Sequence, residues 1–203
     1  MKIALIGATG NVGQRVLDEA LSRGHEVTGL ARSADKLEAR AGLKPVVFDL
    51  TDEESAPAAI AGHDCAVLSV RFNGLDFEQA LRVIDKSGVP RVLIVGGAAS
   101  LEAEPGKQLI DQPGFPKEIK AEAEPARQAL NRLFEEKEID WTFLSPSVFF
   151  GPGERTGTFR LGKDALLTAE DGKSHISYED YAVALLDEIE EPKHRGERFT
   201  VGY

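Results

Sequence analysis

Three glycines near the start of the chain, Gly7, Gly10 and Gly13, are spaced three residues apart. An apolar run over residues 2–6 precedes them and an amphipathic helical pattern follows them. In such a strand–turn–helix the first glycine permits a sharp turn, the second lets a phosphate approach bare backbone, and the third lets helix and strand pack closely. The helix N-terminus then offers unpaired N–H groups and a positive dipole end to the anion. The spacing therefore predicts a turn that binds the pyrophosphate of a dinucleotide, through Gly7, Thr9, Gly10, Asn11 and Val12.

The residues after the second predicted strand indicate which dinucleotide binds. In such a sheet the ligand lies across the carboxyl ends of the strands, so the side chains that follow each strand are candidates for contact. An NAD site places Asp or Glu after the second strand, whereas this chain has Arg32 and Ser33. A guanidinium and a hydroxyl suit a 2′-phosphate. We therefore predict NADP, with NAD as the alternative in which Arg32 is a solvated surface residue.

The ends of the other predicted strands supply further candidate cofactor contacts. Asp49 and Leu50 follow the third strand, where the carboxylate either accepts a hydrogen bond from the adenine amine or caps the next helix. We expect the ends of the fourth and fifth strands to flank the ribose and nicotinamide of the cofactor, through Ser69, Val70, Gly96 and Gly97.

The elements that position these residues alternate along the chain. Apolar runs predict strands over residues 2–6, 25–30, 44–49, 65–70, 91–95, 141–145 and 197–201. Helical patterns predict helices over residues 13–23, 33–42, 51–61, 77–87, 117–137 and 178–190, and a small hairpin is expected over 158–168. The long irregular segment over residues 96–117 is typical of a lid or binding loop.

This alternation of strands and helices predicts the fold class. It forces parallel pairing of the strands, with helices on both faces of the sheet. We predict an α/β protein with a Rossmann-type, doubly wound, mostly parallel sheet of six or seven strands. The whole chain, residues 1–203, is expected to form a single NAD(P)-binding domain, with residues 146–203 contributing a small C-terminal lobe on the substrate side.

Composition narrows the choice of partners. Lys and Arg number 24 against 34 Asp and Glu, and the resulting net charge of −10 argues against nucleic acid and acidic membranes. The single cysteine, Cys65, cannot form an internal disulfide, and the first residues lack the pattern of a secretory signal, so we expect a cytoplasmic protein. The four histidines are scattered without ligand spacing, and no metal site is predicted. We expect a monomer or a homodimer.

Three segments together resemble the atypical and extended short-chain dehydrogenase/reductase superfamily. They are Gly7 to Gly13, the stretch at 144–153 (Leu-Ser-Pro-Ser-Val-Phe-Phe-Gly-Pro-Gly) and the stretch at 176–182. Within the superfamily the chain is most similar to small bacterial proteins described as NADH-flavin reductases or as NAD-dependent epimerase/dehydratase-like. These proteins share its compact length and the segment at 151–157. The resemblance implies that the backbone near the sixth strand holds the nicotinamide, through Pro146, Ser147, Val148 and Phe149.

One departure from the superfamily concerns the catalytic residues. Its alcohol-oxidising members use a Tyr followed four residues later by a Lys, with a Ser that orients the substrate. This chain has Ser100 and Lys120, which are the candidate catalytic residues, but Pro116 stands four residues before the lysine. Lys120 is otherwise a solvated residue at a helix start. The tyrosines, Tyr178, Tyr181 and Tyr203, all lie near the C-terminus.

A missing phenolic acid favours hydride transfer to an acceptor that spreads the new charge over its own rings. We therefore predict an NAD(P)H-dependent reductase of a flavin or quinone-like planar acceptor, with the flavin as substrate and not as a bound prosthetic group. Aromatic residues near the strand ends either sandwich that acceptor or belong to the core: Phe72, Phe115, Phe149 and Phe150. A non-catalytic redox-sensing regulator that binds the dinucleotide is one alternative. A nucleotide-sugar epimerase or dehydratase is another.

Overall fold

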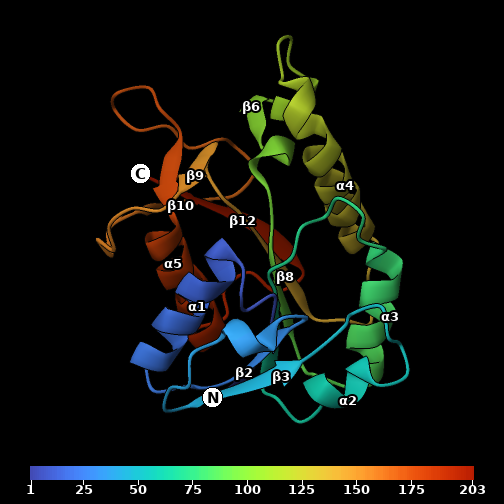
Figure 1. Ribbon diagram of the computed structural model, residues 1–203. Coiled ribbons are helices and arrows are strands. Elements are labelled where there is room, and N and C mark those ends of the chain that lie inside the picture. Colours follow the sequence, from blue (N-terminus) through green and yellow to red (C-terminus); the bar gives the residue numbers. More distant parts are fainter.

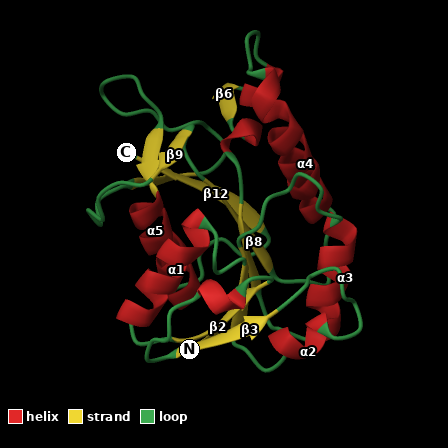
Figure 2. Cartoon of the chain, viewed as in Figure 1, coloured by secondary structure: helices red, strands yellow, loops and turns green.

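A central sheet of eight strands crosses the molecule (Figure 1, Figure 2). The computed structural model describes residues 1–203. The strands are β1 (Lys2–Ile6), β2 (Glu26–Ala31), β3 (Leu43–Val47), β4 (Cys65–Leu68), β5 (Val92–Val95), β8 (Trp141–Ser145), β10 (Arg160–Gly162) and β12 (Glu197–Gly202). Their order across the sheet is β10-β12-β8-β5-β4-β1-β2-β3, and only β10 is antiparallel to its neighbour. The carboxyl ends of the parallel strands therefore share one edge.

Helices cover both faces of this sheet. On one face lie α1 (Asn11–Ser22) and α5 (Tyr178–Glu190), and on the other lie α2 (Ala56–Ile60), α3 (Phe77–Ser87) and α4 (Lys117–Phe134) (Figure 1). Each face has its own hydrophobic cluster, and alternate residues of the strands point into one or the other. Double coverage explains why β4 and β5 are apolar along their whole length, since both faces of these strands are buried.

The termini of two helices show how local sequence sets their bounds. The Asp76 carboxylate accepts a hydrogen bond from the Gln79 N–H at 2.9 Å and begins α3, and Gly88, at φ 65°, ends it. The Ser177 hydroxyl accepts from the Asp180 N–H at 2.9 Å and begins α5. These side chains fix where each helix starts and so place its apolar face over the sheet.

The predicted fold class is confirmed, and all the predicted strands join the parallel part of the sheet. The expected hairpin over residues 158–168 is wrong, because β10 pairs with β12 across the chain and supplies the eighth strand. The segment from Ser33 contains only a short 3-10 turn, η1 (Ala34–Lys36), and α2 is shorter than expected. The Asp52 carboxylate accepts from the N–H groups of residues 54 and 55 and holds them in a turn, so the helix starts only after Ser55.

The segment over residues 96–117 is structured. It contains two further 3-10 turns, η2 (Ala98–Ser100) and η3 (Leu109–Asp111), and the short antiparallel pair β6 (Glu102–Glu104) and β7 (Lys107–Gln108). On the C-terminal side, β9 (Phe149–Gly151) pairs with β11 (His175–Ser177) beside the main sheet. Of the expected C-terminal lobe, β10, α5 and β12 belong to the main sheet and its helical layer, whereas β9 and β11 form a separate pair. None of the helices is both long enough and apolar enough to span a membrane.

Candidate functional site

Two cavities lie along the carboxyl edge of the parallel sheet. The first, which we call the polar cavity, has a volume of about 510 Å³ and opens at the ends of β1, β2, β3 and β4. The second, the apolar cavity, has a volume of about 450 Å³ and opens at the ends of β5 and β8. Since β4 and β5 are neighbours in the sheet, the two cavities adjoin. The chain also reverses direction across the sheet between β1 and β4, the position where ligands bind in open α/β folds.

Most of the predicted cofactor contacts line the polar cavity. The structure brings together the glycine turn and the residues after three further strands: Gly7, Thr9, Gly10, Arg32, Ser33, Asp49, Leu50, Ser69 and Val70. Sequence reasoning missed three polar or charged residues of the same wall, Arg71, Asn73 and Thr51. Arg71 directly follows Val70 at the end of the fourth predicted strand, and this position is the signal that marks it as a candidate contact.

The glycine turn is held by close packing. Gly7 has φ 89°, and a Cβ there would lie 2.0 Å from the Ser69 carbonyl oxygen. A Cβ on Gly13 would lie 2.1 Å from the carbonyl oxygen of Gly7, so this glycine lets α1 pack onto the turn. No side chain caps α1, and its first turn carries no acidic residue. The first N–H groups of the helix are therefore available to an anion.

The arginines of the polar cavity differ from all the others in the chain. Arg32 and Arg71 both line this cavity, and neither makes a hydrogen bond or an ion pair within the protein. Every other arginine donates at least one hydrogen bond, as Arg40 does to Asp18. Two unpaired guanidinium groups near the free N–H groups at the start of α1 form a surface suited to phosphate.

Asp49 has a defined partner in the structure. One of its carboxylate oxygens, Oδ1, accepts hydrogen bonds from the backbone N–H and the hydroxyl of Thr51, at 2.9 and 2.8 Å. These bonds, with a smaller contribution from the positive charge of Arg32, lower the pKa of Asp49. The alternative that Asp49 caps the following helix is wrong, since Ser55 stands before the first residue of α2. Its contact with an adenine stays a prediction.

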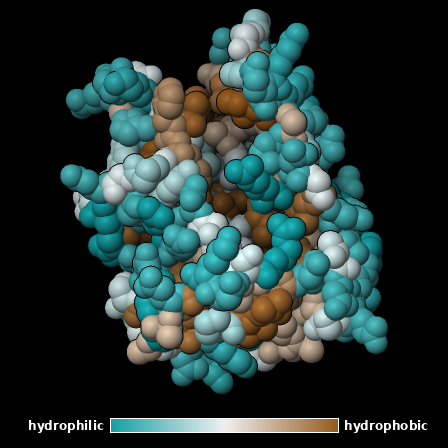
Figure 3. All heavy atoms as spheres, viewed as in Figure 1, coloured by the Kyte–Doolittle hydropathy of each residue, from teal (hydrophilic) through white to brown (hydrophobic).

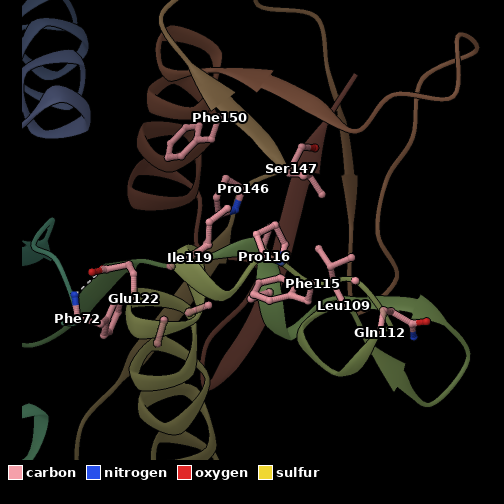
Figure 4. A pocket seen from close by; sticks show the side chains of 18 of the residues that line it. Phe72, Leu109, Gln112, Phe115, Pro116, Ile119, Glu122, Pro146, Ser147 and Phe150 are labelled. Carbon is pink, nitrogen blue, oxygen red and sulfur yellow. Dashed lines mark hydrogen bonds between the residues drawn. The ribbon is translucent and has the colours of Figure 1, made fainter.

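The apolar cavity has a different lining (Figure 4). Predicted nicotinamide contacts are part of it: Gly96, Gly97, Pro146, Ser147 and Val148. It is completed by residues from the 96–117 segment, from α4 and from the C-terminal lobe, including Leu109, Gln112, Phe115, Ile119, Glu122 and Phe150. Figure 3 shows hydrophobic residues inside the notch between α4 and the β9 side of the molecule. The 96–117 segment thus forms a wall of this cavity.

The two glycines at the end of β5 are explained by different physical effects. A Cβ on Gly96 would lie 2.1 Å from the ring of Phe143, so packing alone requires a glycine there. A Cβ on Gly97 would meet only the Cβ of Ala126, at an ordinary 3.8 Å, and the backbone of Gly97 is extended. Neither strain nor packing requires this second glycine. Its missing side chain leaves the apolar cavity wider.

One loop separates the two cavities. Residues 69–75 follow β4, and within this loop Phe72 lines the apolar cavity whereas Asn73 lines the polar one. The Glu122 carboxylate on α4 accepts a hydrogen bond from the backbone N–H of Phe72 at 2.7 Å (Figure 4) and a second one from the backbone N–H of Asn73 at 3.2 Å. Glu122 therefore anchors the dividing loop to α4 by a carboxylate bonded to two successive amides.

Several predicted site residues lie outside both cavities. Asn11 and Val12 form the start of α1, and Phe149 is two-thirds exposed and lines a separate hollow beside β11. Ser100 is buried, and its hydroxyl lies 3.5 Å from a guanidinium nitrogen of Arg198. Lys120 is exposed on α4. Neither residue lines the apolar cavity, and their catalytic role stays a prediction.

The tyrosines have structural partners. Tyr181 is fully buried, its hydroxyl donates to the Leu144 carbonyl oxygen at 2.7 Å, and burial raises its pKa. The Tyr203 hydroxyl donates to the Asp180 carboxylate at 2.7 Å. Tyr178 packs edge-on against Phe150. No tyrosine and no lysine is among the residues that line the apolar cavity.

Residues 7–192 match the model of a protein family described as NAD(P)H-binding. The chain belongs to this NAD(P)H-binding family. The uncharacterized protein YwnB of Bacillus subtilis is 41% identical over 208 residues, which cover 99% of this chain and 98% of YwnB. The match places the glycine turn and the cavities of this chain within a family defined by nicotinamide dinucleotide binding.

Two solved structures resemble the whole chain. A proposed epimerase of Bacteroides thetaiotaomicron has a TM-score of 0.94 at 41% identity, with 100% of this chain and 96% of that one covered. A proposed NADH-flavin reductase of Streptococcus pneumoniae has a TM-score of 0.87 at 34% identity, with 100% and 99% covered. The predicted resemblance is confirmed, and these relatives support the general class of NAD(P)H-dependent oxidoreductases.

Proposed function

We propose that this protein is an NADPH-dependent oxidoreductase that transfers hydride to a flavin or quinone-like planar acceptor. The observation that carries the proposal is the pair of unpaired arginines, Arg32 and Arg71, in a cavity that also holds the glycine turn. NADP differs from NAD by one phosphate, and unpaired guanidinium groups are the side chains best suited to bind it. An adjoining apolar cavity on the same edge of the sheet then provides the place for an acceptor.

The residues of the polar cavity fit the cofactor. The turn at Gly7 to Gly10, with the free N–H groups of α1, would hold the pyrophosphate, and Arg32 with Ser33 would hold the 2′-phosphate. The nicotinamide would lie toward Gly97 and Pro146, at the start of the apolar cavity. When bound, NADPH supplies a hydride, which carries two electrons to the acceptor, and solvent supplies the accompanying proton.

The apolar cavity suits an acceptor that needs no protein acid. Its only ionisable side chain is Glu122, whose carboxylate is bonded to two backbone amides. Phe72, Phe115 and Phe150 offer aromatic surface, and Gly97 leaves room beside it. The role of these residues is to position a flat ring system and to exclude water. A ring system that spreads the incoming charge fits this lining better than an isolated carbonyl group does.

Steady-state oxidation of NADPH and NADH, with riboflavin, flavin mononucleotide and a neutral quinone as acceptors, tests the proposal. We expect turnover with at least one acceptor and a clear preference for NADPH. Calorimetry with each dinucleotide measures binding separately. Tight dinucleotide binding without turnover of any acceptor would contradict the proposed reaction.

The main alternative is a non-catalytic sensor that binds the dinucleotide. It is favoured by one observation, the lack of a free acid, base or nucleophile in the apolar cavity. An epimerase or dehydratase would need such a group, so the absence of tyrosine and lysine from the lining weighs against that reaction. Binding of NADPH without turnover would support the sensor.

Location, oligomeric state and partners are part of the proposal as well. We propose a cytoplasmic protein, a monomer or homodimer, with a small planar acceptor and with neither nucleic acid nor membrane as a partner. Fractionation and light scattering would test location and oligomeric state.

A further inference from the structure

The apolar cavity contains no cationic side chain. No lysine, arginine or histidine is among its lining residues, and its one charged residue is the anionic Glu122. The polar cavity, by contrast, holds two unpaired arginines. Cations are thus placed where the dinucleotide phosphates are expected and are absent where the acceptor is expected.

Two of the three polar side chains that line the apolar cavity already have partners within the protein. The Ser147 hydroxyl donates to the carbonyl oxygen of Val201 at 3.0 Å. The Glu122 carboxylate accepts from two backbone amides. The side-chain amide of Gln112 makes no hydrogen bond within the protein and is free to bind a ligand. A neutral carbonyl or ring nitrogen matches such an amide, whereas a phosphate would lack a cationic partner.

The cationic side chains around the apolar cavity either form ion pairs with carboxylates or do not line the cavity. Arg127 is paired with Asp111 and Glu124, and Arg198 with Asp164. Lys117 and Lys120 are exposed on the first turns of α4. That helix begins at the cavity with its positive dipole end, but Glu118 in the first turn offsets this charge. Within the lining itself, an anion would therefore meet one carboxylate and no cation.

We propose, resting on the function proposed above, that the apolar cavity selects planar acceptors that carry no phosphate or other anionic group. A neutral quinone or a flavin without phosphate is the preferred class, and flavin mononucleotide is disfavoured. Riboflavin and flavin mononucleotide have the same ring system and differ in one phosphate, so comparing them isolates the effect of charge.

The first experiment measures binding and turnover of this pair with the full-length protein. Quenching of flavin fluorescence, with saturating NADP⁺, gives the two affinities without any need for turnover, and NADPH oxidation gives the two kcat/KM values. We expect riboflavin to exceed flavin mononucleotide by about tenfold or more in both measurements. Equal values, or a preference for the phosphorylated flavin, would overturn the selectivity. Preferential riboflavin binding without turnover of any acceptor would overturn the proposed reaction and leave the selectivity standing. No binding of either flavin, together with no turnover of the neutral quinone, would overturn both.

A charge introduced at the mouth of the cavity sharpens the test. Ile119 lines the cavity and is 54% exposed, so its substitution should not disturb the core. Ile119→Lys should narrow the preference for riboflavin by roughly fivefold or more, because it gives the phosphate a partner. Ile119→Gln, of similar length and without charge, should leave the preference unchanged. If the wild type prefers the phosphorylated flavin and Lys120→Gln removes that preference, the phosphate binds Lys120 and the inference is wrong.

Discussion

The two cavities are built from the same edge of one sheet but from different kinds of residue. The polar cavity is lined by strand ends and a glycine turn that stand close together in the first 75 residues. The apolar cavity combines the ends of β5 and β8 with a segment between them and with one face of α4. Unpaired cations occur in the first cavity and are missing from the second.

This difference fits the two roles proposed for the cavities, dinucleotide binding and acceptor binding. A dinucleotide is recognised by its phosphates, which require N–H groups and guanidinium groups at defined places. A flat acceptor is recognised by shape and apolar surface, which many combinations of side chains can provide. The loop that divides the cavities, anchored by Glu122, sets the geometry of both.

The largest effect is expected from Gly7→Ala. The new Cβ would lie 2.0 Å from a carbonyl oxygen, at a backbone angle that only glycine adopts readily, so the turn must move. We expect a loss of more than about 3 kcal/mol in the free energy of unfolding, together with loss of dinucleotide binding in calorimetry. Gly62→Ala is the matched control, since Gly62 has a similar φ and nothing within 4 Å of its would-be Cβ. Equal losses in both variants would show that backbone conformation, and not contact with Ser69, decides the effect.

Arg32→Ala should change the choice of cofactor. Loss of a charge-assisted hydrogen bond to a 2′-phosphate is expected to raise the KM for NADPH by about 10- to 100-fold and to leave NADH nearly unchanged. Arg40→Ala removes a nearby positive charge that is already paired with Asp18, and it serves as the control. If Arg71→Ala discriminates between the two dinucleotides and Arg32→Ala does not, the 2′-phosphate contact belongs to Arg71.

Alanine substitutions at the adjacent residues Gly96 and Gly97 distinguish an effect on packing from an effect on ligand access. Gly96→Ala would place a methyl group against Phe143 and should lower stability by about 1–3 kcal/mol. Gly97→Ala should alter stability by less than about 0.5 kcal/mol, yet lower kcat/KM for the acceptor by roughly tenfold, because its methyl group enters the apolar cavity. Thermal unfolding and steady-state kinetics measure the two effects. A Gly97→Ala variant with the kcat/KM of the wild type would show that the acceptor does not bind at this end of the cavity.

The smallest effect is expected outside both cavities, from Arg155→Ala. Arg155 donates two hydrogen bonds to the buried Glu19 carboxylate, and together with Arg23 these lower the pKa of Glu19 against the effect of its burial. We expect the variant to lose about 1 kcal/mol of stability at neutral pH and to keep its kinetic constants. Because the folded-state pKa lies below the ordinary value of 4.5, the difference from wild type should be complete above roughly pH 5 and should shrink as the pH falls through the lowered pKa. Denaturant titrations across this range would measure the trend, and altered cofactor kinetics would show that the cavities are not independent of this region.

Sequence patterns alone predict the parallel sheet and most residues of the polar cavity. Each predicted contact there follows a strand directly, and the carboxyl ends of parallel strands meet at one edge whatever the details of packing. The apolar runs and the helix caps at Asp76 and Ser177 are likewise local signals, which explains why the main elements were predictable. Arg71, which was not predicted, also follows a strand end closely and could have been predicted in the same way.

The apolar cavity, by contrast, depends on packing between segments that are distant in the sequence. Its lining joins Gly97, Phe115, Glu122 and Val148, residues whose proximity depends on how α4 and the 96–117 segment pack over the ends of β5 and β8. The structure also turned Ser100 into the interior, left Lys120 outside the cavity and made the predicted hairpin into an added strand. The physical reason is that strand ends are positioned by regular backbone hydrogen bonds, which sequence patterns reveal. Long segments between strands are positioned by side-chain contacts between distant residues, which such patterns do not contain.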